Sequence, residues 1–282
     1  MKKKTDYTTI LLVFVLFAGL SLLLYPSFSD WWNSFHSSQA ITDYTKQVRD
    51  MSDEDYSRIW QEARDYNYSL TQRRNDYILT DAQKEKYNKL LNISDNGIMG
   101  YIDIPSIKCS LPIYHGTEES VLQVAVGHLE WSSLPVGGEG SHCVLSGHRG
   151  LPSAKLFSDL DKLVIGDLFT LQVLDEILTY EVDQILIVEP KDTKALHIED
   201  GKDYCTLVTC TPYGINSHRL LVRGHRIETV EETIIRVSAE ATQIDPMMVA
   251  PAVAVPFLLL MLLYVIIPRK STHQGGEYYE DD

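Results

Sequence analysis

Two residues near the end of the chain have the types and the spacing for acyl-transfer chemistry. The segment Thr206–Gly214 reads TLVTCTPYG and puts Cys210 at the end of a predicted strand, before a proline/glycine loop. A side chain at such a position is held by the strand and is still reachable. Arg219 begins the next predicted strand, so the loop should bring the two side chains together. A fixed guanidinium beside a thiol favours the thiolate and offers planar donors to an oxyanion, which indicates nucleophilic catalysis.

A cysteine nucleophile also needs a proton-transfer partner, and histidine is the usual one. The chain contains nine histidines. His148 stands out because it ends a predicted strand in the glycine-flanked turn VLSGHRG. His218, next to Arg219, is the alternative. Spacing alone leaves both histidines open.

The other three cysteines fit structural roles. Cys109, Cys143 and Cys205 lie inside predicted strands, where cysteine usually acts as a small buried hydrophobic residue. Cys205 has the opposite strand parity from Cys210, so the two should point to opposite faces. In an exported chain the four cysteines could form two disulfides, although at least one thiol is expected to stay reduced.

Three motifs resemble those of the sortases. They are TLVTCTPYG at Thr206–Gly214 with HRLLVRG at His218–Gly224, LSGHRGLP at Leu145–Pro152, and IMGYIDIPSI at Ile98–Ile107. Together they cover roughly residues 90–228, and three motifs in the family's order are much more specific than one. The resemblance implies an eight-stranded β-barrel with Cys210 as nucleophile, His148 as acid/base and Arg219 as electrostatic stabiliser.

Within that family, a helical N-terminal extension and a second membrane span resemble class C, the pilin-polymerising sortases. The resemblance implies cleavage of an LPxTG-like sorting signal through a Cys210 thioester, then transfer to a pilin lysine as an isopeptide bond. The expected partners are pilin subunits or surface proteins with C-terminal sorting signals, and the membrane. No cofactor is required, and no metal site is expected.

Three other functions fit the same residues. One is a housekeeping sortase that attaches surface proteins to the cell wall, and another is a hydrolytic cysteine peptidase. The third is a membrane-tethered binding module with a structural thiol, which would leave the motifs around His148, Cys210 and Arg219 without a purpose.

One feature departs from the class C pattern. Those enzymes commonly carry an Asp-Pro-aromatic lid over the cysteine. Here the best match is Asp76 and Tyr77, and no proline occurs between Met51 and Gly97. The lid is therefore expected to be degenerate or absent.

Short β-rich runs, separated by glycine and proline, must position these residues. Seven or eight such strands predict a mainly β sandwich or closed barrel. The runs are Met99–Ile104, Cys109–Ile113, Ser141–Leu145, Leu168–Leu174, Leu178–Val188, Tyr204–Cys210 and Arg219–Ile227. Residues 30–98 are expected to be helical and polar, with helix starts at Ser52 and at the capping box Thr80–Gln83.

Two apolar runs flank this body. Ile10–Leu24 is on the border between a signal-peptide core and a short spanning helix. Met247–Ile267 is long enough, at ~1.5 Å per residue, to cross the ~30 Å hydrocarbon core. Lys2–Lys4 precede the first run, and Arg269 and Lys270 follow the second. The positive-inside rule then predicts a cell-membrane protein with both tails cytoplasmic and the body extracellular.

The expected domain organisation follows from these elements. The net charge of −14 argues against nucleic acid as a partner. In order, we expect a cytoplasmic tail (1–9), a membrane segment or signal anchor (10–25), a helical extension with the degenerate lid (26–96), a sortase-type barrel (97–230), a linker (231–246), a transmembrane helix (247–268) and an acidic cytoplasmic tail (269–282).

Overall fold

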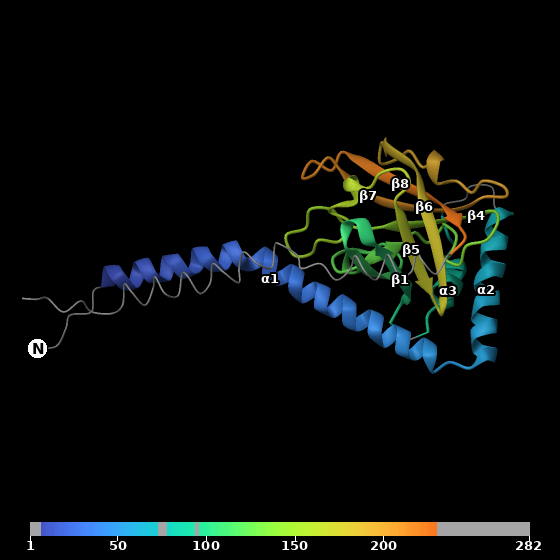
Figure 1. Cartoon of the computed structure of the whole chain (residues 1–282), viewed down its shortest axis with the longest axis horizontal. Helices are drawn as coiled ribbons and strands as arrows, with labels where there is room; N and C mark the ends of the chain where they lie inside the picture. The colour runs from blue at the N-terminus through green and yellow to red at the C-terminus, as the bar shows by residue number, and fades with distance from the viewer. Residues whose placement is uncertain (1–6, 73–77, 94–95, 230–282) are drawn as a thin grey trace, which may run out of the picture. The chain divides into compact units, whose positions relative to one another are not determined.

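The structure is a computed structural model that describes residues 7–72, 78–93 and 96–229 (Figure 1). Several sequence predictions lie outside these residues. They are the lid candidates Asp76 and Tyr77, the linker 231–246, the C-terminal span 247–268 and the tail 269–282.

Eight strands close into a barrel, which confirms the predicted fold class (Figure 1). The hydrogen-bonded order around the barrel is β1-β2-β3-β4-β7-β8-β6-β5. The strands are β1 (Ile98–Ile104), β2 (Cys109–His115), β3 (Val126–His128), β4 (Ser141–Ser146), β5 (Leu168–Val173), β6 (Glu176–Val188), β7 (Asp203–Thr211) and β8 (His218–Ile227). Closure leaves the barrel no free edge along which other chains could add a strand.

Seven strands coincide with the predicted runs to within about two residues, because each run alternates and ends at turn residues. The eighth, β3, was not predicted. It pairs in parallel with β2 and antiparallel with β4. Three residues are too few to show the alternation from which a strand is recognised.

The sheet formed by β4, β7 and β8 buries apolar side chains on both faces. Cys205 and Leu207 of β7 belong to the large barrel core. Val208, on the alternate face, belongs to a smaller cluster that includes Val144 and Leu221. Successive residues of a strand point to opposite faces, so one strand supplies both clusters. Cys210 shares the face of Val208, and Cys205 lies on the other face and is fully buried, as the parity argument predicts.

Three N-terminal helices precede the barrel: α1 (Tyr7–Arg49), α2 (Asp53–Thr71) and α3 (Asp81–Lys89). Both predicted helix starts are confirmed. The Ser52 hydroxyl accepts a hydrogen bond from Asp55 N, and Thr80 and Gln83 form the reciprocal capping box. Such caps satisfy backbone N–H groups that have no partner within the helix.

Helix α1 joins two segments that the sequence analysis treated separately. It runs without a break from Tyr7 to Arg49, 43 residues in all, through the predicted membrane segment (10–25) and into the predicted helical extension (26–96). Pro26 is the only proline in it, and Figure 1 shows that the helix bends along its length. A proline inside a helix removes one hydrogen bond and bends the axis, and neighbouring turns can continue beyond it.

The second half of α1 packs on the barrel. The buried Tyr44 hydroxyl donates to Met99 O at 2.9 Å and accepts from Leu174 N at 2.8 Å. Burial raises the pKa of Tyr44, so its hydroxyl stays protonated and continues to donate. These two bonds connect α1 to β1 and to the turn between β5 and β6.

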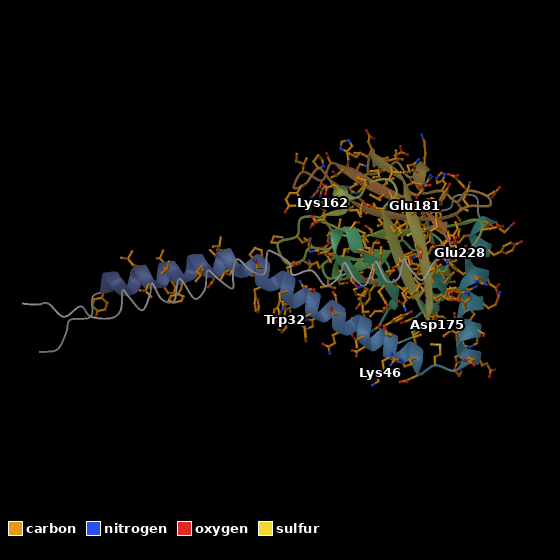
Figure 2. All side chains as sticks on the ribbon, in the orientation of Figure 1. Trp32, Lys46, Lys162, Asp175, Glu181 and Glu228 are labelled. Atoms are coloured by element: carbon orange, nitrogen blue, oxygen red, sulfur yellow. The ribbon has the colours of Figure 1, made fainter. Side chains whose placement is uncertain are left out.

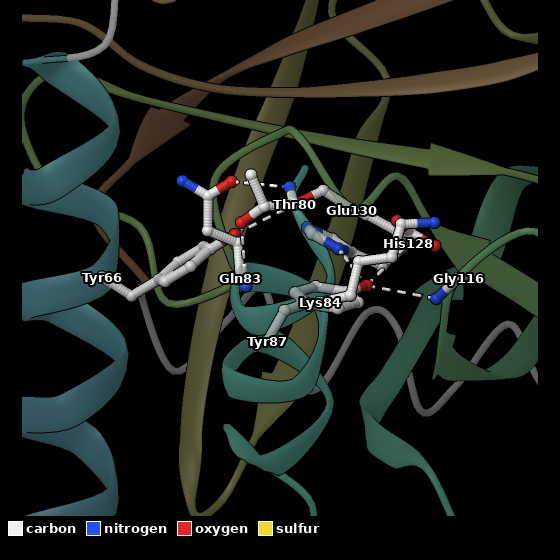
Figure 3. Close-up of polar contacts among 8 residues, drawn as sticks. All are labelled: Tyr66, Thr80, Gln83, Lys84, Tyr87, Gly116, His128 and Glu130. Atoms are coloured by element: carbon white, nitrogen blue, oxygen red, sulfur yellow. Dashed lines mark hydrogen bonds and ion pairs between the residues drawn. The ribbon is translucent and has the colours of Figure 1, made fainter. Parts of the chain in front are cut away.

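Helix α3 is attached to the barrel through Tyr87 (Figure 3). The Tyr87 hydroxyl lies 2.9 Å from His128 Nδ1 in β3 and accepts a hydrogen bond from Gly116 N at 3.1 Å. Lys84 on the same helix forms an ion pair with Glu130 at 3.3 Å. These contacts hold the segment after β2, which leads into the short helix α4 (Glu119–Leu122).

Candidate active site

Cys210 and Arg219 are direct cross-strand partners. The antiparallel register of β7 and β8 pairs Cys210 with Arg219, as it pairs Val208 with Leu221. Directly opposed residues of antiparallel strands share one face, with Cβ atoms about 4.5–5.5 Å apart. The Arg219 Nη1 donates to Asn216 O at 3.3 Å and to His218 O at 3.1 Å, so the 212–217 loop helps to hold the guanidinium.

His148 reaches the same end of the sheet from β4. The parallel register of β4 and β7 pairs Ser146 with Val208, two positions before His148 and Cys210 respectively. Two hydrogen bonds join the intervening Gly147 to β7: Gly147 N donates to Val208 O at 3.0 Å, and the Thr209 hydroxyl donates to Gly147 O at 2.8 Å. The turn that carries His148 is therefore attached directly to the strand that carries Cys210.

The turn requires glycine at position 147 for steric reasons. A Cβ atom at Gly147 would lie 2.7 Å from Phe157 Cδ2. Phe157 is fully buried, and its backbone N donates to His148 O at 3.1 Å. The loop after His148 thus folds back, so that the Phe157 ring lies against Gly147 and the Phe157 backbone is bonded to His148. These contacts hold the backbone of His148 in place.

Arg149 connects the loop after β4, which carries His148, with the end of β7, which carries Cys210. Its side chain is only 9% exposed and forms an ion pair with Asp161. Its Nη1 donates to the Thr211 hydroxyl at 3.3 Å, and its Cζ lies 5.8 Å from the centroid of the Tyr213 ring. Sequence analysis assigned Arg149 no role, because an arginine next to a histidine gives no local signal of these distant contacts.

Glu119 of α4 is the charged group beside His148. Its Oε2 lies 3.5 Å from His148 Nε2, a distance at which a protonated imidazole would form an ion pair. The hydrogen bond from Gln123 lowers the pKa of Glu119, and the neighbouring His148 lowers it further. Glu119 is 70% exposed, so solvent screens this pair. Its position was not predicted either.

The remaining candidates lie apart from this cluster. His218 pairs across the strands with Thr211, next to the pair formed by Cys210 and Arg219, so alternation directs its side chain to the opposite face. Its Nδ1 lies 2.8 Å from the Ser217 hydroxyl. Sequence spacing had left His148 and His218 as alternatives. Ser146, two residues before His148, pairs with Val208 on the outer face that carries Cys210, whereas His218 lies on the other face of β8.

The four cysteines are all free thiols, and the two disulfides considered from the sequence do not form. Cys109, Cys143 and Cys205 are buried, whereas Cys210 is partly exposed. Burial raises the pKa of Cys109 to about 12 and that of Cys205 well above its usual range. Burial also raises the pKa of Cys143, but hydrogen bonds with Cys205 and His128 outweigh it and lower that pKa to about 6. Cys143 is only 2% exposed, and a thiol that substrate cannot reach is a poor nucleophile. Among the residues that the structure describes, no group of three or more His, Cys, Asp and Glu side chains could hold a metal ion.

Residues 102–227 match the family model described as a sortase domain, and this range contains the whole cluster. The chain is also 53% identical to the crystal structure of sortase C1 from Streptococcus agalactiae, with a TM-score of 0.67, covering 68% of this chain and all of that one. This chain belongs to the sortase family.

Two further proteins are similar to this sortase. The structure of Streptococcus pneumoniae sortase C is 46% identical over 68% of this chain and 97% of that one, with a TM-score of 0.62. Sortase D of Bacillus subtilis is 33% identical over 131 residues, which is 45% of this chain and 63% of that protein. The likeness to sortases C extends beyond the barrel, and within the family this sortase is most like class C.

Proposed function

We propose that this sortase is a membrane-anchored, extracellular cysteine transpeptidase of class C type. It cleaves an LPxTG-like sorting signal and joins the released carbonyl to a lysine of a pilin subunit. The observation that carries the proposal is the register that pairs Cys210 with Arg219 while Gly147, one residue before His148, is bonded to the same strand. Each of these residues has a distinct role in acyl transfer.

In the first half-reaction the Cys210 thiolate attacks the threonine carbonyl carbon of the signal. The carbonyl oxygen becomes an oxyanion, which Arg219 stabilises through its N–H donors. Protonated His148 donates its proton to the glycine nitrogen as the Thr–Gly bond breaks. The products are a Cys210 thioester and a peptide with a free amino terminus.

In the second half-reaction a lysine amine attacks the thioester carbonyl. His148, now neutral, accepts a proton from the attacking nitrogen, and Arg219 again stabilises the oxyanion. The C–S bond breaks, an isopeptide bond forms and the Cys210 thiolate returns. The two acyl transfers balance in atoms, protons and charge, and neither requires an oxidant, a metal or a nucleotide.

The choice of a pilin lysine as acceptor is supported by likeness. The structure of the pneumococcal sortase C is described in terms of pilin substrate specificity, and this chain shares 46% identity with it. The proposed substrates are pilin subunits with C-terminal sorting signals. A cell-wall amine is the alternative acceptor, and a housekeeping sortase would use it.

Membrane attachment is supported by α1. Among the described residues, one helix is long and apolar enough to cross a bilayer, and it lies near the N-terminus. Lys2–Lys4 precede its apolar part, which favours a cytoplasmic N-terminus and an extracellular barrel. A second span at 247–268, followed by Arg269 and Lys270, would return the chain to the cytoplasm.

The test is a reaction between a soluble fragment (residues 30–246), a sorting-signal peptide and recombinant pilin, analysed by mass spectrometry. A Thr–Lys isopeptide that disappears in Cys210→Ala and persists in the buried control Cys109→Ala is expected. Pilin whose lysines have been reductively dimethylated should not react. Hydrolysis without transfer would identify a peptidase, and transfer only to a peptidoglycan-type amine would identify a housekeeping sortase.

A further inference from the structure

An aromatic stripe lies exposed on α1, just beyond its apolar run. It consists of Phe28, Trp31, Trp32 and Phe35, which are exposed by 60%, 44%, 50% and 56%. Their spacing of three and four residues places them on one face of the helix. Adjacent rings pack on one another, with Phe28 and Trp31 centroids 5.8 Å apart and Trp31 and Phe35 centroids 6.3 Å apart. The stripe is thus a continuous apolar surface.

The opposite face of the same turns is attached to the barrel. Asp30 Oδ1 accepts a hydrogen bond from Lys155 N at 2.6 Å, and Asn33 Nδ2 donates to Ser153 O at 2.7 Å. At about 100° per residue, these two side chains point away from the stripe. Figure 2 shows Trp32 on the side of α1 that faces away from the barrel. The barrel that α1 contacts therefore does not cover the stripe.

We propose that the aromatic stripe lies in the headgroup region of the outer leaflet of the membrane. The stripe continues directly from the apolar run Ile10–Leu24 on one unbroken helix. Tryptophan is enriched at this depth because its ring is apolar and its N–H can still be hydrated. This inference rests on the membrane attachment proposed above. It adds that the helix leans along the bilayer surface with one defined face towards the lipid.

The bend in α1 makes this orientation possible. On a straight helix along the membrane normal, Phe35 would lie roughly 16 Å beyond Leu24, outside a headgroup layer about 5–8 Å thick. A helix that bends, as α1 does in Figure 1, and leans over keeps the whole stripe within that layer, and Pro26 inside the helix is a physical cause for such a bend. It also turns the opposite face, with Asp30 and Asn33, towards the barrel and the water.

The arrangement fixes the active-site loop close to the bilayer. The backbone groups held by Asp30 and Asn33 belong to residues 153–155, within the loop that begins at His148 and returns through the Phe157–His148 hydrogen bond. The loop that carries the proposed acid/base is thus attached to the same helical turns that carry the stripe. A substrate held on the same bilayer would meet this site at a high effective concentration.

Fluorescence quenching tests the location of the stripe. The full chain is reconstituted in phosphatidylcholine/phosphatidylglycerol vesicles whose lipids carry bromine either near the headgroup or near the bilayer centre. The wild type should be quenched more strongly by the shallow label. Trp31→Phe/Trp32→Phe should lose most of this quenching, because its remaining tryptophans, Trp60 in α2 and Trp131 between β3 and β4, lie outside the stripe. Equal shallow quenching of the two proteins would overturn the proposal. The proposal would also be overturned if neither lipid label quenched Trp31 and Trp32 because a second copy of the chain covers the stripe.

An activity comparison tests the consequence. Trp31→Ser/Trp32→Ser should reduce cleavage of a lipid-anchored sorting-signal peptide in vesicles by roughly tenfold, and leave cleavage of the soluble peptide unchanged. Tyr68→Ser is the matched control, an aromatic residue on α2 that is 71% exposed and lies off the stripe. Equal rates for the stripe variant and the control on the anchored peptide would contradict the inference. A wild type that cleaves neither peptide would refute the proposed function, and the quenching experiment would still decide where the stripe lies.

Discussion

Arg149 donates a hydrogen bond from Nη1 to the Thr211 hydroxyl, 3.3 Å away, and so joins the residue after His148 to the residue after Cys210. The same guanidinium forms an ion pair with Asp161 and faces the Tyr213 ring. One buried side chain therefore connects the loop after β4, the end of β7 and the loop before β8. We interpret Arg149 as a positioning residue for the proposed site.

Replacing Arg149 with lysine should lower kcat by roughly tenfold with little change in KM, because a single ammonium cannot keep the contacts to Thr211, Asp161 and Tyr213 together. Steady-state kinetics on a sorting-signal peptide measures this effect. Arg223→Lys is the control, since Arg223 also pairs with an acid, Asp183 of β6, but lies in the middle of β8 and away from the contacts of Arg149. Equal kcat values for wild type and Arg149→Lys would show that Arg149 only stabilises the loop.

The accessible thiol should be the essential one. Cys210→Ala should abolish cleavage and transfer, and Cys109→Ala, Cys143→Ala and Cys205→Ala should each retain most of the activity, because those thiols are buried. Iodoacetamide labelling of the folded protein, followed by peptide mass mapping, should modify Cys210 first. A folded Cys205→Ala variant without activity would remove the basis for Cys210 as nucleophile.

Arg219→Lys distinguishes a planar donor from a simple positive charge. We expect kcat to fall on the order of 100-fold or more, comparable with the loss of an oxyanion-hole donor, and the fold to persist. Circular dichroism provides the folding control for the kinetic measurement. Near-normal turnover in the lysine variant would mean that a point charge is sufficient.

The two histidines should differ in their importance. His148→Ala should be at least as damaging as Arg219→Lys, because in the proposed reaction His148 transfers a proton in both half-reactions. His218→Ala should lower activity much less, since its side chain lies on the other face of β8. The reverse order of the two kcat values would assign proton transfer to His218.

Stability should fall in mild acid because of His142. Burial lowers the pKa of His142 from 6.5 to about 4, against the raising effect of its hydrogen bond to His197 O. The unfolded chain then binds a proton that the folded chain does not, so stability is complete above pH ~6.5 and is lost as the pH falls towards 4. The shift corresponds to roughly 3 kcal/mol.

Urea unfolding of the 30–246 fragment at pH 7 and at pH 4.5 measures this loss. His142→Gln should flatten the pH dependence relative to wild type, and the exposed His36→Gln should leave it unchanged. His115 is partly buried and also has a lowered pKa, so part of the dependence should remain. Identical pH slopes for wild type and His142→Gln would show that His142 does not contribute.

Much of the fold could be predicted from the sequence because its signals are local. Seven strands show alternation bounded by turn residues, and the two helix caps at Ser52 and Thr80 are short motifs. The neighbouring positions of Cys210 and Arg219 follow from two consecutive strands joined by a short loop. Such information lies within a few tens of residues, where backbone propensity and side-chain periodicity are strong.

Tertiary structure alone decided the contacts between distant segments. Closure of the barrel inserts β3 between β2 and β4, aligns the end of β4 with β7 and brings Glu119 to His148. It also gives Arg149 its partners and docks Asp30 and Asn33 of α1 on the loop after His148. These contacts depend on packing between elements far apart in the chain, and no local period of the sequence encodes which side chains meet there.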